Sequence, residues 1–209
     1  KVKPKFGDGK SGSLMWFDEL FFIKQLKKDD IVGLNKIFPN YCLYCQKIEG
    51  QTLLSKFVGV FKIKTPDKFL LKRKSMKVLV MMKMDIGKNA ITFDLKGSVK
   101  NRITDTNMKK TKKDGNLRGK RIVMNSSDAY AEFVNRLQSD VRFLRKNGVI
   151  DYSLFVILDN DSLDSEDVQI VEPHKTLSTK MKVSIIDFLQ LYNLRKKVES
   201  TVKAKSLKK

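Results

Sequence analysis

A segment at residues 128–146 is the feature that most constrains the fold of this chain. Its apolar residues recur at intervals of four, four and three positions, at Phe133, Leu137, Val141 and Leu144. This spacing places them on one face of an α-helix. Serines precede the segment and Gly148 follows it, as expected at the two ends of a helix. We therefore predict one long helix that packs a single face against the rest of the fold.

Short apolar segments with strand patterns lie on both sides of this helix. They cover residues 20–24, 56–63, 76–84 and 91–93 before it, and 152–158, 168–171 and 181–188 after it. We expect residues 29–54 to be largely helical, with a break near Pro39, because proline removes a backbone donor from a helix. The mixture of one long helix with many strands predicts an α+β fold.

The chain is strongly basic. Its 209 residues include 43 Lys and Arg against 23 Asp and Glu, a net charge of +20. Such a field attracts polyanions, namely nucleic acid, an anionic membrane surface or phosphorylated small molecules. Hydrophobic residues make up 41% of the chain, and no apolar run approaches the roughly 20 residues of a bilayer crossing. The composition is that of a soluble globular domain.

Two basic clusters and one cysteine pair say less about the function of the chain. Residues 109–121 and the tail at 195–209 are each explained as readily by a solvated face as by a binding surface. Together they favour docking on an anionic plane. Cys42 and Cys45 have the spacing of a redox or zinc half-site, but the single histidine, His174, lies far along the chain. Buried thiols on one helix face are therefore favoured.

The stretch Phe93-Asp94-Leu95-Lys96-Gly97-Ser98 combines an acid, a base, a glycine and a hydroxyl. Phosphoryl transfer uses groups of these kinds, because it depends on positioning and charge neutralisation. Asp94 and Lys96 have strand spacing, so their side chains are expected on the same face. A local ion pair on a solvated face is the alternative interpretation.

Four further positions are candidates for the same chemistry. The glycine-bearing turn at residues 9–13 can offer backbone N–H groups to phosphate oxygens, and Lys24 on the next strand can neutralise them. Asp187 ends an apolar run, where it can hold a divalent metal or cap a following helix. Asp151 lies between apolar residues, and a turn aspartate after Gly148 is its alternative.

In this order, the motifs resemble the phosphatidylinositol phosphate kinase family, and specifically its phosphatidylinositol-4-phosphate 5-kinase-like members. The motifs are Lys-Ser-Gly-Ser at 10–13, Phe-Ile-Lys at 22–24, Phe-Asp-Leu-Lys-Gly-Ser at 93–98 with Arg102, Ile-Asp-Tyr-Ser-Leu at 150–154, and Ile-Ile-Asp at 185–187. The match covers almost the entire chain.

The resemblance implies a role for each matching residue. Lys24 is implied as the ATP-phosphate lysine, Asp151 as the catalytic aspartate and Asp187 as the catalytic aspartate that binds Mg²⁺. The implied phosphate loop consists of Lys10, Ser11, Gly12 and Ser13. Asp94 and Lys96 are implied at the ATP-binding mouth of the site. Contacts with lipid substrate and membrane are implied for Arg102, Lys196, Lys197 and Glu199.

The resemblance also implies a two-lobed lipid-kinase fold. An antiparallel N-terminal lobe at residues 1–88 and a smaller mixed C-terminal lobe at residues 89–209 would enclose an ATP cleft. The implied enzyme transfers the γ-phosphate of ATP, with Mg²⁺, to a monophosphorylated phosphoinositide on the cytosolic face of membranes. Glu199 favours the 5-position, and phosphatidylinositol 4-phosphate is the expected substrate. Phosphatidylinositol 3-phosphate is the alternative.

Three other function classes have less support. A nucleic-acid-binding module suits the charge, but the chain lacks the interleaved aromatics of a single-strand platform. A catalytically silent scaffold of the same family would not need Lys24, Asp151 and Asp187 together. The HRD, DFG and GxGxxG signatures of protein kinases are absent from the sequence. We expect no nucleic-acid partner, and the sequence leaves the oligomeric state open.

Overall fold

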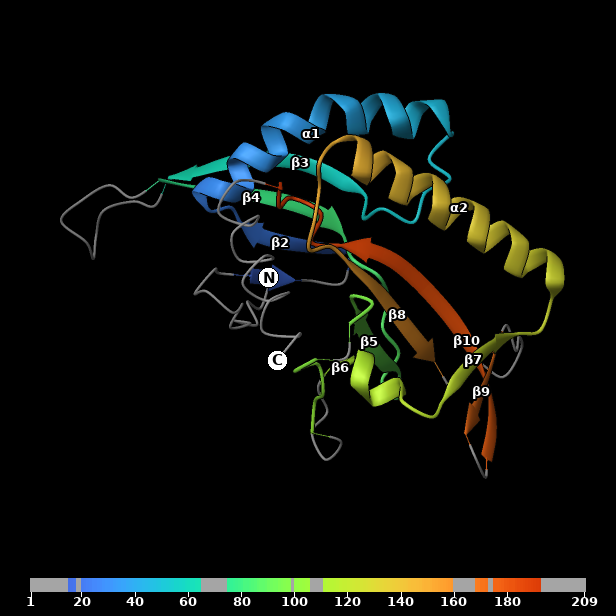
Figure 1. Ribbon diagram of the computed structural model, residues 1–209. Coiled ribbons are helices and arrows are strands. Elements are labelled where there is room, and N and C mark those ends of the chain that lie inside the picture. Colours follow the sequence, from blue (N-terminus) through green and yellow to red (C-terminus); the bar gives the residue numbers. More distant parts are fainter. Residues whose placement is uncertain are drawn as a thin grey trace, which may run out of the picture.

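The computed structural model describes residues 15–17, 20–64, 75–98, 100–105, 111–159, 168–172 and 175–192, and it contains two sheets and two long helices (Figure 1). The first sheet is antiparallel with strand order β1-β2-β4-β3, formed by β1 (Met15–Phe17), β2 (Phe21–Gln25), β4 (Ser75–Met82) and β3 (Phe57–Lys64). This sheet matches the antiparallel N-terminal lobe expected from the sequence.

The second sheet is mixed and has strand order β6-β5-β8-β10-β9-β7. Its strands are β6 (Lys112–Lys113), β5 (Ile91–Leu95), β8 (Ser153–Asp159), β10 (Lys175–Ile186), β9 (Val168–Glu172) and β7 (Arg121–Met124). A short 3₁₀ turn, η1 (Asp114–Leu117), follows β6. Among the described residues, β7 and β9 widen this sheet to six strands, against four in the first.

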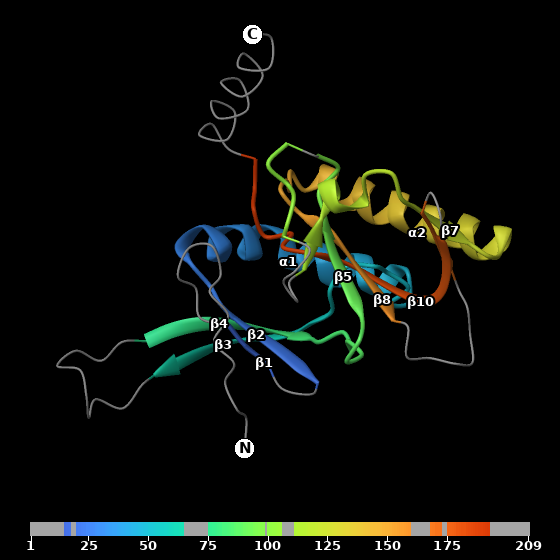
Figure 2. The ribbon, with the colours of Figure 1, turned by 90° about the horizontal axis from the view of Figure 1, so that it is seen from below.

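The helices α1 (Lys28–Lys47) and α2 (Ser127–Lys146) lie side by side on one side of the molecule (Figure 1). Seen from below, the two sheets lie next to each other in front of the helices (Figure 2). Within the described ranges, no helix combines the length and the apolar character that a bilayer crossing requires.

The α2 helix confirms the prediction made from its apolar stripe. The hydroxyl of Ser126 accepts a hydrogen bond from the backbone N–H of Ala129 at 3.2 Å, which caps the N-terminal end. At the other end the chain reverses at Gly148, with φ of +68°. This left-handed conformation favours glycine and ends the helix.

The expected break in α1 near Pro39 is wrong. The helix continues without interruption through Pro39 and ends at Lys47 instead of near residue 54. Pro39 and Asn35, whose carbonyl loses its usual donor, are both exposed, so water can take the place of the missing backbone bond. The helix ends where Glu49 and Gly50 adopt φ of +52° and +72°.

The strand predictions are confirmed, with one informative shift in a boundary. The strand expected at residues 181–188 is β10, which begins earlier, at Lys175, and ends at Ile186. Asp187 and Phe188 therefore lie beyond the strand. This boundary matters because Asp187 is a candidate site residue.

One hydrophobic core joins the two helices to both sheets. Its buried members include Ile37 of α1, Leu79 of β4, Leu144 of α2 and Ile185 of β10. The rings of Tyr44 and Phe143 stack at 4.5 Å where α1 meets α2. A second hydrophobic cluster, around Phe93, Val156 and Leu158, is formed by side chains from strands of the second sheet. The proposed division at residue 88 thus runs through a shared core.

Gly33 of α1 supplies a test of this packing. A Cβ atom added there would lie 1.7 Å from the carbonyl oxygen of Leu189, just after Asp187. At an exposed helix position, a Gly→Ala substitution stabilises the helix by about 1 kcal/mol. We expect Gly33→Ala instead to lower the free energy of unfolding by about 1–3 kcal/mol, because backbone must move. Urea denaturation of the variant and the wild type measures the difference.

Asn35→Ala is the matched control, since it adds an alanine at an exposed position of the same helix. It should leave the unfolding free energy unchanged or slightly raised. A stabilising Gly33→Ala would contradict the close approach of α1 to Leu189.

Candidate active site

A cavity of about 480 Å³ lies between the first sheet and the strands β5, β8 and β10. Its walls are mostly apolar, and the charged residues in its lining are Lys24, Lys83, Asp94 and Asp187. Its lining includes Phe22, Leu79, Met81, Met84, Ile86, Phe155, Ile186 and Phe188. A mostly apolar cleft with a few charged groups is the usual form of a small-molecule site.

Lys24 projects from β2 towards two carboxylates. Its Nζ atom lies 3.6 Å from Oδ1 of Asp30 and 3.6 Å from Oδ1 of Asp187. Asp30 belongs to the first turn of α1 and also accepts a hydrogen bond from the backbone N–H of Lys27 at 3.0 Å. The Asp30 carboxylate thus caps the N-terminal end of α1 and also orients Lys24. The ammonium group of Lys24 lies at the cavity.

Asp151 and Asp187 are held at the same end of two paired strands. Asp151 precedes β8 and Asp187 follows β10, and these strands pair so that Ser153 lies opposite Ile186. Both aspartates have φ of +61°, a left-handed conformation that is uncommon outside glycine. Such backbone strain concentrates at functional sites.

Lys96 contacts Asp151 directly. Its Nζ atom donates to Oδ1 and to the backbone carbonyl of Asp151, at 2.6 Å in each case. Lys96 and Asp94 do not act as a pair, although strand spacing placed them on one face. Lys96 lies beyond the end of β5, which stops at Leu95, and Asp94 binds Arg102 instead.

Arg102 lies between two carboxylates. It donates to the backbone carbonyl and side chain of Asp94, and its Nε atom lies 2.5 Å from Oδ2 of Asp114. The side chains of Arg102 and Asp114 are only 12% and 10% exposed. Asp94, Arg102 and Asp114 therefore form a partly buried ion-pair network, called here the Arg102 network.

Asp114 also holds the loop that carries Lys96. Its carboxylate accepts the backbone N–H groups of Lys96 and Gly97 at 3.0 and 2.8 Å, and that of Ser98 at 3.3 Å. Burial opposes ionisation of this carboxyl. Even so, the Arg102 guanidinium and these backbone donors keep the pKa of Asp114 below its ordinary value. The network thus fixes the backbone from which Lys96 reaches Asp151.

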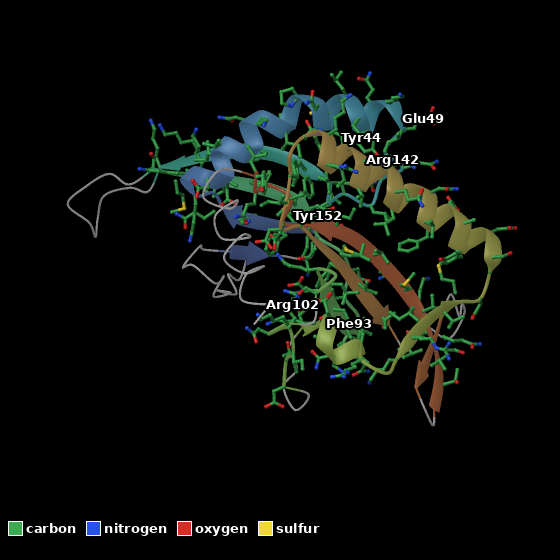
Figure 3. The ribbon with its side chains drawn as sticks, viewed as in Figure 1. Tyr44, Glu49, Phe93, Arg102, Arg142 and Tyr152 are labelled. Atoms are coloured by element: carbon green, nitrogen blue, oxygen red, sulfur yellow. The ribbon has the colours of Figure 1, made fainter. Side chains whose placement is uncertain are left out.

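A second, more open cavity of about 1130 Å³ lies on the Asp151 side of the site. It is bordered by Lys96, Asp151 and Tyr192 and by apolar residues of α2, including Leu137 and Val141. Figure 3 shows Tyr152 near the junction of the sheets, with Arg102 below it. The two cavities lie on either side of the site, and the second is the more open.

The carboxylates near Lys24 suit a magnesium ion only in part. Within the described ranges, no group of three or more His, Cys, Asp or Glu side chains could hold a metal ion. The side chain of Asp187 is 57% exposed and faces the first cavity. Mg²⁺ usually takes one or two carboxylates and completes its shell with water and phosphate oxygens. Asp187 fits that pattern.

Several of the predicted site residues lie outside the part of the chain that the structure describes. They are Lys10, Ser11, Gly12, Ser13, Lys196, Lys197 and Glu199. The single histidine, His174, which was not predicted as a site residue, also lies outside it. Cys42 and Cys45 are both free on α1. Cys42 is exposed, so the expected burial of both thiols is wrong for it. Burial does raise the pKa of Cys45.

Asp30 and Asp114 were missed in the sequence. For Asp30, the available signal was its place three residues after Lys27, in a typical capping position at the start of a helix. For Asp114 there was no local signal, because it acts on residues that lie 12–18 positions away along the chain.

Comparisons with known proteins indicate the family of the chain. A family model described as phosphatidylinositol-4-phosphate 5-kinase matches residues 2–182. The chain is 29% identical over 94% of its length to a mouse (Mus musculus) 1-phosphatidylinositol 3-phosphate 5-kinase. It is 28% identical over 73% of its length to a Danio rerio phosphatidylinositol 5-phosphate 4-kinase type-2 gamma, and 31% identical over 71% to Arabidopsis thaliana phosphatidylinositol 4-phosphate 5-kinase 3. It spans only 9%, 38% and 21% of these relatives, respectively.

The Arg102 network predicts a pH-dependent stability. Because the folded-state pKa of Asp114 lies below the ordinary value of 3.8, its contribution is present above that value and is lost as pH falls through the folded pKa. We expect Asp114→Asn to lower the unfolding free energy by about 3 kcal/mol near neutral pH, since Arg102 loses a buried partner. The difference from the wild type should shrink below about pH 4.

Chemical denaturation across a pH series measures this difference. Asp128→Asn, in the exposed first turn of α2, is the control and should have little effect. A difference that stays constant down to the lowest pH would contradict the assigned ionisation of Asp114.

Proposed function

The chain belongs to the phosphatidylinositol-4-phosphate 5-kinase family, and we propose that it transfers the γ-phosphate of ATP to the 5-position of a phosphatidylinositol monophosphate. One observation carries the proposal. Asp151 and Asp187 lie at the same end of the paired strands β8 and β10, and Lys24 contacts Asp187. A base, a metal ligand and a phosphate-neutralising cation are the groups that phosphoryl transfer requires.

The nucleotide occupies the 480 Å³ cavity in this proposal. Its apolar walls, with Phe22, Leu79 and Phe155, suit a flat adenine ring. Lys24 binds the phosphates, and Asp30 keeps its ammonium group in place. The ion pair between Lys24 and Asp30 is thereby a positioning contact that lasts through the reaction.

Asp187 would hold the magnesium ion that accompanies ATP, and this ion would supply positive charge to the phosphate oxygens. At the end of β10, the Asp187 carboxylate lies 3.6 Å from Lys24, the residue that binds the phosphates. The lysine and the aspartate therefore need no large rearrangement between substrate and transition state, which favours catalysis.

Asp151 orients the acceptor hydroxyl and receives its proton. Lys96 holds the Asp151 carboxylate by a 2.6 Å ion pair and presents a positive charge beside it. That charge suits the phosphate already present on a phosphoinositide. The inositol ring would approach from the open second cavity, which borders both residues.

Two phosphatidylinositol monophosphates are candidates for the acceptor substrate. Phosphatidylinositol 4-phosphate is the substrate expected from the sequence. The extent of similarity favours phosphatidylinositol 3-phosphate, since the relative matched over 94% of this chain is a 3-phosphate 5-kinase and the Arabidopsis 4-phosphate 5-kinase is matched over 71%. We place the 3-phosphate first and keep the 4-phosphate as the second candidate.

The net charge of +20 supports a role at an anionic cytosolic membrane surface. Each well-placed Lys or Arg adds about 1 kcal/mol of attraction to such a surface. Lys196, Lys197 and Glu199, together with the phosphate loop at residues 10–13, keep their proposed roles in membrane, substrate and ATP binding.

Phosphate transfer to vesicles tests the function. Vesicles that contain the 3-, 4- or 5-monophosphate are incubated separately with purified protein, Mg²⁺ and labelled ATP, and the position of the new phosphate is determined. We expect transfer to the 5-position of the 3-phosphate, and about 100- to 10,000-fold slower transfer by Asp151→Asn, which lacks the proton acceptor.

Asp128→Asn makes the same chemical change on the exposed surface of α2 and should retain wild-type activity. Transfer to the 4-phosphate alone would select the second candidate. Failure of the wild type to phosphorylate any of the three lipids would refute the proposed function.

A further inference from the structure

Asp140 of α2 is a buried carboxylate that the proposed chemistry does not use. It is 1% exposed. Its oxygens accept hydrogen bonds from three uncharged donors: the Tyr44 hydroxyl at 2.8 Å, the Thr52 hydroxyl at 2.7 Å and the Leu53 N–H at 2.7 Å. A carboxylate at this depth is costly unless its oxygens are well satisfied. The elements that carry these three donors are therefore the ones that Asp140 joins.

Two of those donors belong to a segment between α1 and β3, residues 52–55, called here the strap. Thr52 gives its hydroxyl to Asp140 and also accepts the N–H of Leu54 at 3.0 Å. The third donor, Tyr44, lies on α1 where that helix meets α2 (Figure 3). Asp140 thus joins α2 to the strap and, separately, to α1.

The strap lies along the last residues of β10. The Leu53 carbonyl accepts the Ile185 N–H at 2.6 Å, and the Ser55 N–H donates to the Ile185 carbonyl at 3.0 Å. The Ser184 hydroxyl also donates to Leu53, at 3.0 Å. Both backbone polar groups of Ile185 are therefore held by the strap, while β8 pairs with the other side of the strand.

Ile185 is two residues before Asp187. We propose that Asp140 is a positioning residue for Asp187: it anchors the strap, and the strap fixes the end of β10 from which Asp187 projects. The path is short, because the Leu53 N–H donates to Asp140 and the Leu53 carbonyl accepts the Ile185 N–H. The inference rests on the proposed function for the role of Asp187.

The chemistry of the carboxylate explains why aspartate suits this position. Its two oxygens only accept hydrogen bonds, and three donors face them. An asparagine must turn its NH₂ group either towards the Leu53 N–H, which cannot accept it, or towards the Tyr44 and Thr52 hydroxyls, which must then reverse their hydrogen bonds. Asp140→Asn therefore replaces charge-assisted hydrogen bonds to the strap by weaker neutral ones, or breaks the bond to Leu53, without changing the size of the side chain.

Two measurements on Asp140→Asn test the inference. Hydrogen exchange, followed by mass spectrometry, reports on the Ile185 amide, and calorimetry gives the affinity for ATP in the presence of Mg²⁺. We expect faster exchange in peptides that cover residues 184–187, and roughly tenfold weaker Mg²⁺-dependent ATP binding, as is typical when the support of a metal ligand is lost. ATP binding without Mg²⁺ should change little.

Tyr44→Phe is the matched control. It removes one hydrogen bond to Asp140 and leaves both strap donors in place. Exchange near Ile185 and the Mg²⁺ dependence of ATP binding should match those of the wild type. Equal shifts in Tyr44→Phe and Asp140→Asn would mean that Asp140 only stabilises the fold, and unchanged behaviour of Asp140→Asn would also overturn the inference.

Thr52→Val decides the question if Asp140→Asn does not fold. It removes one strap bond and keeps that of Leu53, so a smaller shift in the same two measurements is expected, and its absence contradicts the inference. Exchange and nucleotide binding do not require lipid turnover. A wild-type protein that transfers no phosphate to lipid would therefore refute the proposed function while leaving the anchoring of β10 by Asp140 open to measurement.

Discussion

The antiparallel pairing of β8 with β10 is the interaction on which the site depends. Seven residue pairs set its register, from Lys180 opposite Asp159 to Ile186 opposite Ser153. Because strand side chains alternate between faces, a shift of one residue would move every side chain to the other face. The register brings Asp151, just before one strand, and Asp187, just after the other, to the same end of the pair.

Each cation of the site is paired with an acid supplied by another part of the fold. Lys24 meets Asp30 and Asp187, Lys96 meets Asp151, and Arg102 lies between Asp94 and Asp114. These contacts offset the strong positive charge locally. They also hold the charged groups before substrate arrives, so that little reorganisation is needed during phosphate transfer.

The sequence predicted the parts of this structure that depend on local pattern or on motif. The stripe of α2 and its caps gave the helix correctly, and the motif order indicated Lys24, Asp151 and Asp187. Two acids were missed because their partners are distant in sequence: Asp114 binds residues 12–18 positions away, and Asp140 binds residues 87–96 positions away. Tertiary structure alone brings these groups together. Asp30 was also missed, although its capping position near Lys24 and Lys27 was a local signal.

The central claim is that the end of β10 presents a metal-binding aspartate to a nucleotide held by Lys24. Calorimetric titration of ATP into the wild type and Asp187→Asn, each with and without Mg²⁺, tests it most directly. The account predicts that Mg²⁺ strengthens ATP binding to the wild type about tenfold or more and has little effect on the variant. Equal strengthening by Mg²⁺ in both proteins would contradict the account.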